Sequence, residues 1–481
     1  MTAKSKLLFT ALGLMALAGA LWTLAYLVPL PERLQAPGSR VVYFADHSPA
    51  YVFLSPDDQW RIPVPLQEVD PLFIRALLAW EDQRFFYHPG VDPIAIVRAL
   101  GQNLRAGQII SGASTLTMQL VRILEPRPRT FRSKVIEALR ALQLEARLSK
   151  REILEAFLQF APYGKNFEGI EAAAYAYFGH SASALDPFEA AYLVSVPQDP
   201  THRFPRPGNM AGRRIAVQRV AERLRREGIF SHQQLEQVEK AQYPAALKPF
   251  PRLAPHASIW LAGRRPEAMR VNSTLRRNVQ TLAENTLAAF RQELCNLGIH
   301  NGAVVVIERR TGQVAALVGN FDFWDREHQG QVVGFNAPRS PGSALKPFLY
   351  ALALDRALAL PTYLVPDIPV RFREYEPRNY DDQFRGLVRL EDALSLSLNV
   401  PFVNLLSELG VEPFLSFLHD AGITTLSPES GYYGLSLAIG GVDLTLLELT
   451  NLYAALSRQG QYLDYSLFRE PGDQPQPRSI L

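Results

Sequence analysis

The sequence of 481 residues contains a single cysteine, Cys295. One thiol excludes an intramolecular disulfide and a cysteine-rich metal site. An excess of one charge sign is also lacking, because 50 basic and 47 acidic residues leave a net charge of +3. This balance gives no reason, from charge alone, to expect nucleic acid as a partner. Internal repeats and low-complexity tracts are absent, and the length predicts two or three domains.

Charged residues are also absent from a stretch near the amino terminus, residues 7–28. As a helix this stretch would span about 33 Å, which is enough to cross a bilayer. Lysines precede it, so the positive-inside rule leaves the short tail in the cytoplasm and the rest of the chain outside. Residues 1–30 are therefore predicted to be a tail and a transmembrane signal anchor. A cleaved signal peptide is the alternative, since AGA at 18–20 resembles a cleavage site.

Patterns typical of β-strands are scarce before residue 300, where helical patterns dominate. A proline-rich, weakly patterned connector at 31–65 precedes an apolar run. That run predicts a helix that starts at Pro71, directly after Asp70, and ends at Glu81. Further helices are expected at 150–160, 168–178, 187–195, 209–226 and 275–294.

Residues 131–148 are expected to form another helix with one apolar face. The stripe that we expect to face the core comprises Val135, Leu139, Leu142 and Leu148. Lys134, Glu137 and Glu145 lie away from that stripe.

The composition changes at about residue 300. The stretch GAVVVIERRTGQVAALVGN (302–320) consists of two β-branched runs separated by a turn, which predicts an antiparallel hairpin. We therefore expect a mainly α domain at 66–244, a linker at 245–300 and a second domain at 301–481.

Two stretches of the helical region combine residues suited to chemistry. EDQRFFYHPGVDP (81–93) places Glu81 and Asp82 at a helix end beside aromatic residues, which can raise the pKa of a carboxyl group as proton transfer requires. The alternative is a solvated helix end followed by a turn. SGASTLTMQLVR (111–122) could receive an anion at a helix start or be only a capped helix. Lys134 and Glu137 are three residues apart and therefore lie on one helical face. They could form a surface ion pair, or they could belong to a site that binds phosphate.

These stretches occur in a recognisable order. EDQRFFYHPGVDP, SGASTLTMQLVR, RSKVIEALRALQLEARLSKREILEAFL (132–158) and PYGKNFEGIEAAAYAYFG (162–179) follow a signal anchor. Together they resemble the glycosyltransferase domain of class A penicillin-binding proteins, the peptidoglycan polymerases of bacteria. Met118 and EPRPRT (125–130) favour the 1C type. The resemblance extends over about residues 60–460 and implies a lysozyme-like first domain.

The resemblance also implies roles for single residues. Glu81 matches the catalytic base, which takes the proton of the acceptor's 4-hydroxyl, and Glu137 matches a second essential glutamate near the donor diphosphate. Positions that would hold the lipid diphosphate are Ser114, Thr115, Gln119, Arg122 and Lys134. Asp82 and His88 fall at motif positions of the substrate site, and Gln159 stands where the family usually has asparagine. A diphosphate leaving group needs cations and N–H donors rather than a general acid.

The second domain resembles the penicilloyl-serine transpeptidase fold, which is of α/β (α+β) type. PGSALKP (341–347) provides Ser343 and Lys346 at S-x-x-K spacing, and SLSLNVP (395–401) provides Ser397 and Asn399 at S-x-N spacing. No K-T-G or K-S-G follows in the sequence. The expectation is therefore a truncated transpeptidase domain that is inactive and reacts poorly with β-lactams.

The resemblance implies a peptidoglycan glycosyltransferase that polymerises lipid II with inversion and releases undecaprenyl diphosphate. Expected partners are lipid II, the lipid-linked glycan chain, the membrane and other cell-wall synthesis proteins, without nucleic acid. No tightly bound cofactor or protein metal site is expected, although a Mg or Mn ion could accompany the diphosphate. The expected location is the bacterial inner membrane, with a single span and the domains in the periplasm. The alternatives are a non-catalytic penicillin-binding-like scaffold and a lysozyme-like hydrolase.

Overall fold

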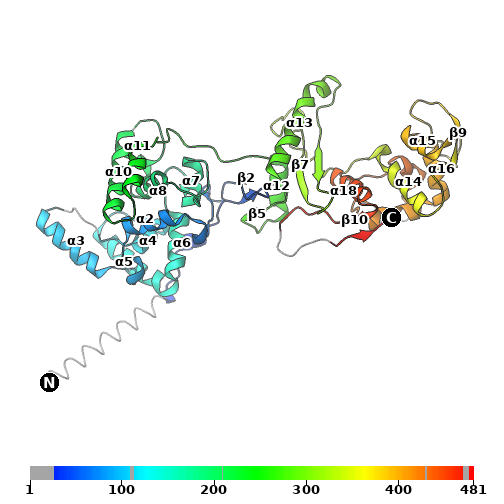
Figure 1. Cartoon of the computed structure of the whole chain (residues 1–481). Coiled ribbons are helices and arrows are strands. Elements are labelled where there is room, and N and C mark those ends of the chain that lie inside the picture. Colours follow the sequence, from blue (N-terminus) through cyan, green and yellow to red (C-terminus); the bar gives the residue numbers. More distant parts are fainter. Residues whose placement is uncertain (1–25, 109–112, 209, 428–430, 470–475) are drawn as a thin grey trace. The chain divides into compact units, whose positions relative to one another are not determined.

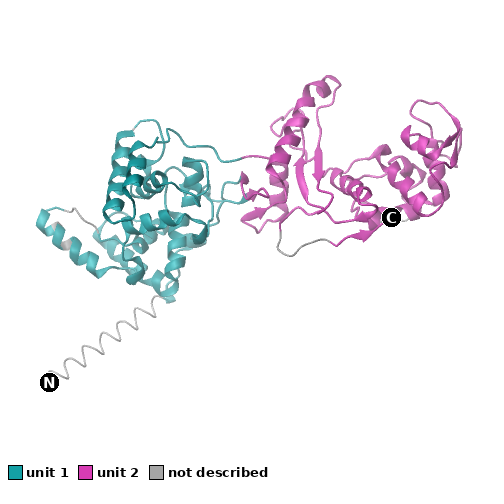
Figure 2. Cartoon of the chain, viewed as in Figure 1, with its two compact units in different colours: residues 1–41, 52–251 teal, residues 42–51, 252–481 magenta. Residues whose placement is uncertain are grey.

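The computed structural model describes residues 26–108, 113–208, 210–427, 431–469 and 476–481. The chain divides into two compact units (Figure 2), residues 1–41 with 52–251 and residues 42–51 with 252–481. Most of the predicted transmembrane stretch, residues 7–25, lies outside the described residues. Within the described ranges, no helix is long and apolar enough to cross a membrane.

The first unit is built mainly from helices (Figure 1). They are α2 (Pro71–Glu81), α3 (Pro93–Ala106), α4 (Leu116–Leu124), α5 (Phe131–Arg147), α6 (Lys150–Phe160), α7 (Ile170–Tyr177), α8 (Pro187–Ser195), α9 (Pro200–Arg203), α10 (Met210–Arg226) and α11 (His232–Lys240). Short 3-10 turns are η1 (Glu32–Gln35), η2 (Leu66–Glu68), η3 (Phe85–Tyr87) and η4 (Val196–Gln198). Helix α8 is almost wholly buried and packs against α2, α10 and α11, so it forms the core of this unit.

Helix starts in this unit follow the capping residues of the sequence. Asp70 accepts a hydrogen bond from Leu72 N at 2.8 Å, and Pro71 is the first residue of α2. Helices α6 and α8 each begin with a capping box, in which two orphan backbone N–H groups find partners. The helices predicted at 150–160, 168–178, 187–195 and 209–226 are confirmed as α6, α7, α8 and α10.

The buried face of α5 is not the predicted one. The helix is confirmed, but Val135, Leu139 and Leu142 are 46%, 50% and 38% exposed, whereas Glu137 and Gln143 are buried. The periodicity rule assumes that the apolar face of a helix packs inward. On α5 the inward face combines Ala141 and Leu144 with buried polar side chains, so the prediction of the core-facing stripe was wrong.

The connector predicted at 31–65 contains regular structure. It includes β3 (Trp60–Arg61), which pairs in parallel with β4 (Phe167–Glu168). The prediction of few strands before residue 300 missed these elements, together with β1 (Val41–Tyr43), β2 (Pro49–Val52) and β5 (Arg270–Asn272). Strands of two to four residues are too short to display an alternating pattern.

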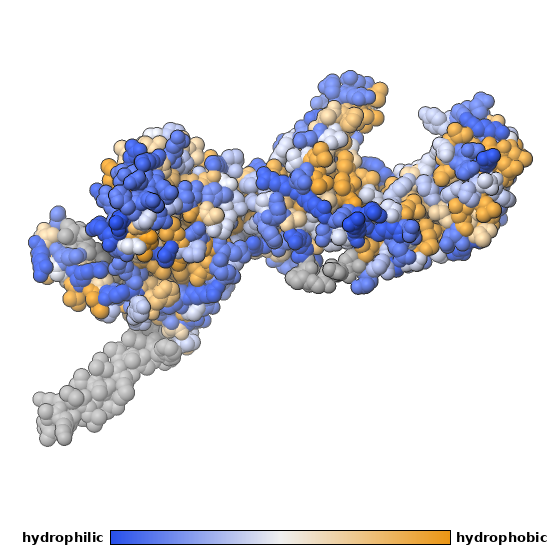
Figure 3. Space-filling view, in the orientation of Figure 1, coloured by the Kyte–Doolittle hydropathy of each residue, from blue (hydrophilic) through white to orange (hydrophobic). Residues whose placement is uncertain are grey.

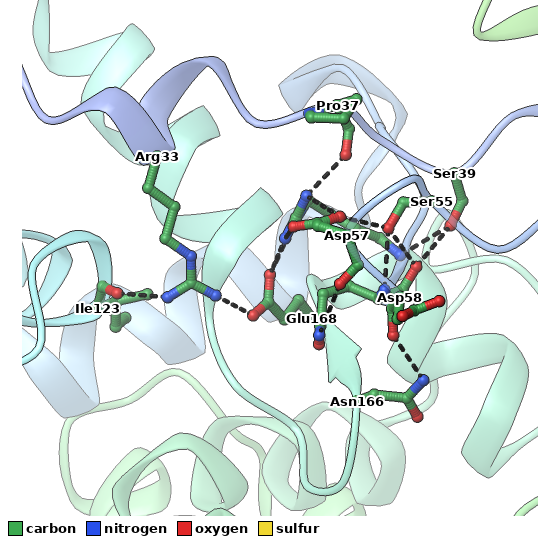
Figure 4. A network of polar contacts seen from close by, with 11 residues as sticks. Arg33, Pro37, Ser39, Ser55, Asp57, Asp58, Ile123, Asn166 and Glu168 are labelled. Atoms are coloured by element: carbon green, nitrogen blue, oxygen red, sulfur yellow. Dashed lines mark hydrogen bonds and ion pairs between the residues drawn. The ribbon is translucent and has the colours of Figure 1, made fainter.

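A polar network ties this connector to the helical body (Figure 4). Arg61 is fully buried, and its Nε donates to Glu168 Oε2 at 2.8 Å while its Nη2 lies 2.9 Å from Asp57 Oδ2. Arg33 pairs with the other oxygen of Glu168 and donates to the carbonyl of Ile123 at 2.6 Å. Because a buried guanidinium is costly without partners, these carboxylates keep the connector folded against the unit.

The second unit combines helices with small sheets. Its helices are α12 (Pro255–Arg264), α13 (Arg277–Asn296), α14 (Lys346–Asp355), α15 (Leu390–Ser395), α16 (Asn399–Leu409), α17 (Val411–Asp420) and α18 (Leu446–Ser457), with η5 (Gly342–Leu345) and η6 (Leu435–Ile439). Its strands are β1 (Val41–Tyr43), β2 (Pro49–Val52), β5 (Arg270–Asn272), β6 (Val304–Ile307), β7 (Val314–Val318), β8 (Leu364–Asp367), β9 (Gly386–Arg389), β10 (Gln461–Tyr462) and β11 (Arg478–Ser479).

The hairpin predicted at 302–320 is confirmed by the antiparallel pair β6–β7. Strands β2, β1 and β5 form a separate three-stranded sheet in that order. The range 245–300, predicted to be a linker, contains α12, β5 and α13, so most of it belongs to the second unit. A small cluster of Ala283, Ala316 and Val318 packs α13 against the hairpin, and a larger apolar core surrounds α14 and α16.

Candidate functional site

Glu81 is the last residue of α2 and is partly exposed. Each of its carboxylate oxygens accepts a hydrogen bond from a different glutamine. Gln119 Nε2 donates to Oε2 at 2.8 Å, and Gln198 Nε2 donates to Oε1 at 3.0 Å. Loss of hydration raises the pKa of Glu81, although these hydrogen bonds and the charges of Arg223 and Arg122 oppose the shift. A fixed carboxyl group with a raised pKa is suited to proton transfer.

Asp82 and His88 form a buried pair beside Glu81. His88 Nε2 lies 3.0 Å from Asp82 Oδ1. Gly90 N donates to His88 Nδ1 at 3.2 Å, which makes Nε2 the nitrogen that donates to Asp82. Asp82 Oδ2 also accepts from Leu116 N at 2.9 Å. Asp82 therefore fixes the start of α4 to the end of α2.

The start of α4 is held by Thr115, which is buried. Its hydroxyl donates to the carbonyl of Gly90 at 2.5 Å and accepts from Met118 N at 3.2 Å. Both hydrogen bonds of the Thr115 hydroxyl are thus made within the protein, whereas the neighbouring Ser114 is partly exposed. The predicted stretch 111–122 begins with residues outside the described part of the chain.

Glu137 is buried on α5, where Arg122 from α4 approaches it. Arg122 Nε lies 3.6 Å from Glu137 Oε1. Lys134 is exposed on α5, about one turn before Glu137. The positive charge of Arg122 also opposes the rise in the pKa of Glu81, so Arg122 lies close enough to influence that carboxylate as well. Helices α2, α4 and α5 thus bring two carboxylates and a guanidinium into one polar site.

Three side chains at this site were missed by the sequence analysis. Gln198 comes from η4, and Arg223 from α10 lies with its guanidinium carbon 5.2 Å from the ring centroid of Trp80. Tyr163 is buried, and both burial and the charge of Glu81 raise its pKa. A glutamine between two prolines, or an arginine in a basic helix, carries no local sign of such a role. Only the packing of distant elements places them near Glu81.

A second polar site surrounds Lys346 in the second unit. Lys346 Nζ donates to Ser397 O at 2.7 Å, to Ser397 Oγ at 3.2 Å and to Asn399 Oδ1 at 2.7 Å. Burial lowers the pKa of Lys346 to about 8. Ser343 is exposed in η5, three residues before this lysine. The structure therefore brings together the lysine of S-x-x-K and both polar residues of S-x-N.

Asn399 has further support that the sequence did not predict. Asn379 Oδ1 accepts from Asn399 N at 2.8 Å, and Asn379 Nδ2 donates to the buried Asp367 at 2.8 Å. This chain of hydrogen bonds fixes the start of α16, where Asn399 lies.

Comparisons with known families agree with this arrangement of two sites. The transglycosylase family matches residues 48–224, and the penicillin binding protein transpeptidase domain matches residues 302–479. The first match contains Glu81 and Glu137, and the second contains Ser343, Lys346 and Asn399. The chain therefore belongs to the class A penicillin-binding proteins, as the sequence resemblance predicted.

Individual relatives are similar over most of this chain. Penicillin-binding protein 1C of Escherichia coli is 37% identical over 92% of the chain and 57% of the relative. Penicillin-binding protein 1B of Haemophilus influenzae is 32% identical over 85% of the chain and 54% of the relative. Penicillin-binding protein 2D of Bacillus subtilis is 30% identical over 90% of the chain and 64% of the relative. The chain thus spans 54% to 64% of the length of these proteins.

Proposed function

We propose that the first unit is a peptidoglycan glycosyltransferase that polymerises lipid II. The observation that carries the proposal is the hydrogen-bonded Glu81 in one site with the Arg122–Glu137 pair. Glu81 would remove the proton from the acceptor's 4-hydroxyl while that oxygen attacks the donor's anomeric carbon. The bond from this carbon to the diphosphate breaks in the same displacement, so the configuration inverts and undecaprenyl diphosphate leaves.

The leaving group carries its own negative charge, and therefore cations rather than an acid are needed beside it. Arg122 and the exposed Lys134 are the cations that we assign to the diphosphate, with Ser114 as a hydroxyl donor. Gln119 is also near, although its amide already binds Glu81 at 2.8 Å. We assign Glu137 to the orientation of Arg122, whose Nε lies 3.6 Å away.

A divalent cation, if present, belongs in this proposal to the substrate rather than to the protein. Among the residues that the structure describes, no group of three or more histidine, cysteine, aspartate or glutamate side chains could hold a metal ion. Mg and Mn ions prefer oxygen ligands, and Mg usually joins one or two carboxylates to substrate phosphates. Glu137 could supply one such oxygen, with the diphosphate and water completing the shell.

The membrane is the surface on which we place this reaction. Apolar side chains are exposed on α3 and α5, as hydrophobic surface in Figure 3 also shows. They include Ile94 (66%), Val97 (71%), Leu104 (79%), Phe131 (84%) and Leu139 (50%). Such a patch is unusual on a protein surrounded only by water. It supports contact with a bilayer that holds the lipid-linked substrate.

The carboxyl-terminal end of the predicted anchor is bound to α5, which carries part of this patch. Gln143 Nε2 donates to Val28 O at 2.5 Å, and Arg140 Nη1 donates to Pro29 O at 2.9 Å. These contacts support an anchor at 7–28 that holds the site near the bilayer. We accordingly propose a location in the bacterial inner membrane with both units in the periplasm, where other cell-wall synthesis proteins would be available as partners.

For the second unit we propose little or no transpeptidase activity in a polypeptide of these 481 residues. Lys346 is bound by Ser397 and Asn399, and Ser343 lies three residues before this lysine, but the K-T-G motif of the family is not among these residues. Acylation also needs preorganised oxyanion donors, and loss of one such donor lowers rates about 10²- to 10³-fold. Incubation with a fluorescent penicillin tests this. Stoichiometric labelling that disappears in Ser343→Ala would refute it.

A polymerisation assay tests the main proposal. The full chain is incubated with lipid II in vesicles, and products are separated by length before and after digestion with a muramidase. Long, muramidase-sensitive glycan is the expected product. No product at all would favour the non-catalytic scaffold. In a parallel incubation with finished wall, release of soluble fragments would favour the hydrolase.

A further inference from the structure

Among the described residues, Gln198 is the one hydrogen-bond donor to the Glu81 carboxylate that belongs neither to a predicted motif nor to the neighbouring α4. It lies at the end of η4, directly after the buried core helix α8. Gln198 itself is exposed, so its side chain contributes little to the apolar core. Its hydrogen bond to Glu81 Oε1 at 3.0 Å spans 117 positions of sequence. The hydrogen bond to Glu81 is therefore a better reason for a glutamine at this position than packing in the core.

The orientation of the Gln198 amide is set by a third residue. Arg203 Nη1 donates to Gln198 Oε1 at 3.4 Å and to Ser195 O at 2.6 Å. A guanidinium donates and never accepts, so the amide oxygen faces Arg203 and the amide nitrogen faces Glu81. The amide is therefore fixed as a donor to the carboxylate. Arg203 is itself held, because its carbonyl accepts from Tyr192 Oη at 3.0 Å.

The other carboxylate oxygen has the same kind of partner. Gln119 donates to Oε2, so two neutral amides hold the carboxylate from two separate elements, α4 and η4. Amide donors stabilise the ionised form of a carboxyl group without adding a charge that could form an ion pair with it. A base held in this way stays ionised and oriented, yet it can still accept a proton, because each carboxylate oxygen has a further lone pair.

We propose that Gln198 is a positioning residue for the general base, which keeps the Glu81 carboxylate ionised and aimed at the acceptor hydroxyl. This inference rests on the proposed glycosyltransferase function. Gln198 acts through Glu81 and needs no contact with the reacting atoms. Loss of hydration raises the pKa of Glu81, and the hydrogen bond from the Gln198 amide partly offsets this rise. Removal of the amide should therefore raise the pKa further.

The test is the pH dependence of kcat/KM for lipid II polymerisation by the full chain. Gln198→Met keeps the size of the side chain and removes the donor. The acid limb of the kcat/KM–pH profile of this variant should move to higher pH. We expect kcat/KM to fall about tenfold on the acid side and less at alkaline pH, because a hydrogen bond to a charged group is lost. Gln237→Met makes the same change at an exposed position of α11 and serves as the matched control.

Gln198→Glu provides a second variant of nearly the same shape. It places a like charge near Glu81, so the acid limb should move at least as far as in Gln198→Met. A structural role alone would lower activity equally at every pH. Superimposable pH profiles of wild type and both variants would therefore overturn the inference, as would a loss that does not depend on pH.

A double variant separates this inference from the function on which it rests. In a Glu81→Gln background, Gln198→Met should cause little further loss, since the residue acts through a base that is already absent. A wild type without polymerase activity would refute the proposed function itself. An active wild type, a Glu81→Gln variant with low but measurable activity and a fully additive double variant would refute only the role of Gln198.

Discussion

Loss of hydration shifts the pKa of Glu81 in the first unit and the pKa of Lys346 in the second, but in opposite directions. Burial raises the pKa of the carboxyl group and lowers the pKa of the ammonium group to about 8. The cause is the same, because a medium poorer in water disfavours whichever form is charged. Each shift moves the group toward the pH range in which it can exchange a proton under physiological conditions.

The surroundings of the two groups differ. Glu81 accepts hydrogen bonds from two amides and lies near the charges of Arg122 and Arg223, and both effects limit the rise in its pKa. Lys346 is bound by neutral oxygens of Ser397 and Asn399, and desolvation alone accounts for its lowered pKa. An anionic leaving group requires cations near the first site, whereas an amine that must lose its proton is best kept away from carboxylates. The partners of Glu81 therefore suit the glycosyl transfer that we propose for the first unit, and the neutral partners of Lys346 suit an amine that exchanges a proton.

Among the predicted changes, replacement of the Glu81 base should have the largest effect on activity. Glu81→Gln keeps the shape of the side chain but cannot accept a proton, so polymerisation should fall by about 10² or more. Substrate binding, measured by lipid II retention on the inactive enzyme, should change little. Glu239→Gln on α11, at an exposed position, is the control. Activity of Glu81→Gln within a few-fold of wild type would exclude this assignment.

Removal of a cation should have the next largest effect. Lys134→Met should lower the rate about tenfold, because the charge that develops on the diphosphate loses a counter-charge. The loss should appear in single-turnover kinetics with the donor saturated. Lys240→Met removes an exposed lysine that pairs with Glu236 on α11, and it should leave the rate unchanged. Equal donor kinetics in Lys134→Met and wild type would contradict the role of Lys134.

The exposed apolar side chains of α3 and α5 allow a third test, of the bilayer contact proposed for the first unit. Leu139→Asp on α5 should lower polymerisation of lipid II in vesicles about fivefold, because it removes apolar area from the proposed bilayer contact. The same change at Leu282 on α13, which is 68% exposed compared with 50% for Leu139, should have no such effect. Rates in vesicles are compared with rates in detergent for both variants. Equal losses in both variants would argue against a bilayer contact specific to α5.

The smallest expected effect is a pH dependence of stability in the second unit. Lys346 has a pKa of about 8 when folded and 10.5 as its reference value, so between these values the unfolded chain binds more protons. Stability of the wild type should therefore rise with pH from about 8 to 10.5, as linkage requires. Lys346→Met should lack this rise. Melting temperatures of both chains across this range measure it, and parallel curves would show that Lys346 is not responsible.

Local patterns of the sequence were sufficient for much of the fold. The helix from Pro71 to Glu81 was predicted from its cap and first-turn proline, and the 302–320 hairpin from two β-branched runs. Both depend on hydrogen bonds between neighbours in sequence. The short strands β1 to β5 were missed, because their pairing partners are distant and their length shows no period. The roles of Glu81 and Glu137 stay predictions that follow from the resemblance.

The sequence by itself determined which residues could carry the chemistry: a glutamate at a helix end, a lysine one turn from a second glutamate, and a lysine at S-x-x-K spacing. Only the tertiary structure decided how these groups are held. It turned the apolar side of α5 outward, placed Gln198 on Glu81 and surrounded Lys346 with Ser397 and Asn399. The physical reason is that capping and periodicity act within a few residues. Desolvation and hydrogen bonding at a site depend instead on groups that only chain folding brings together.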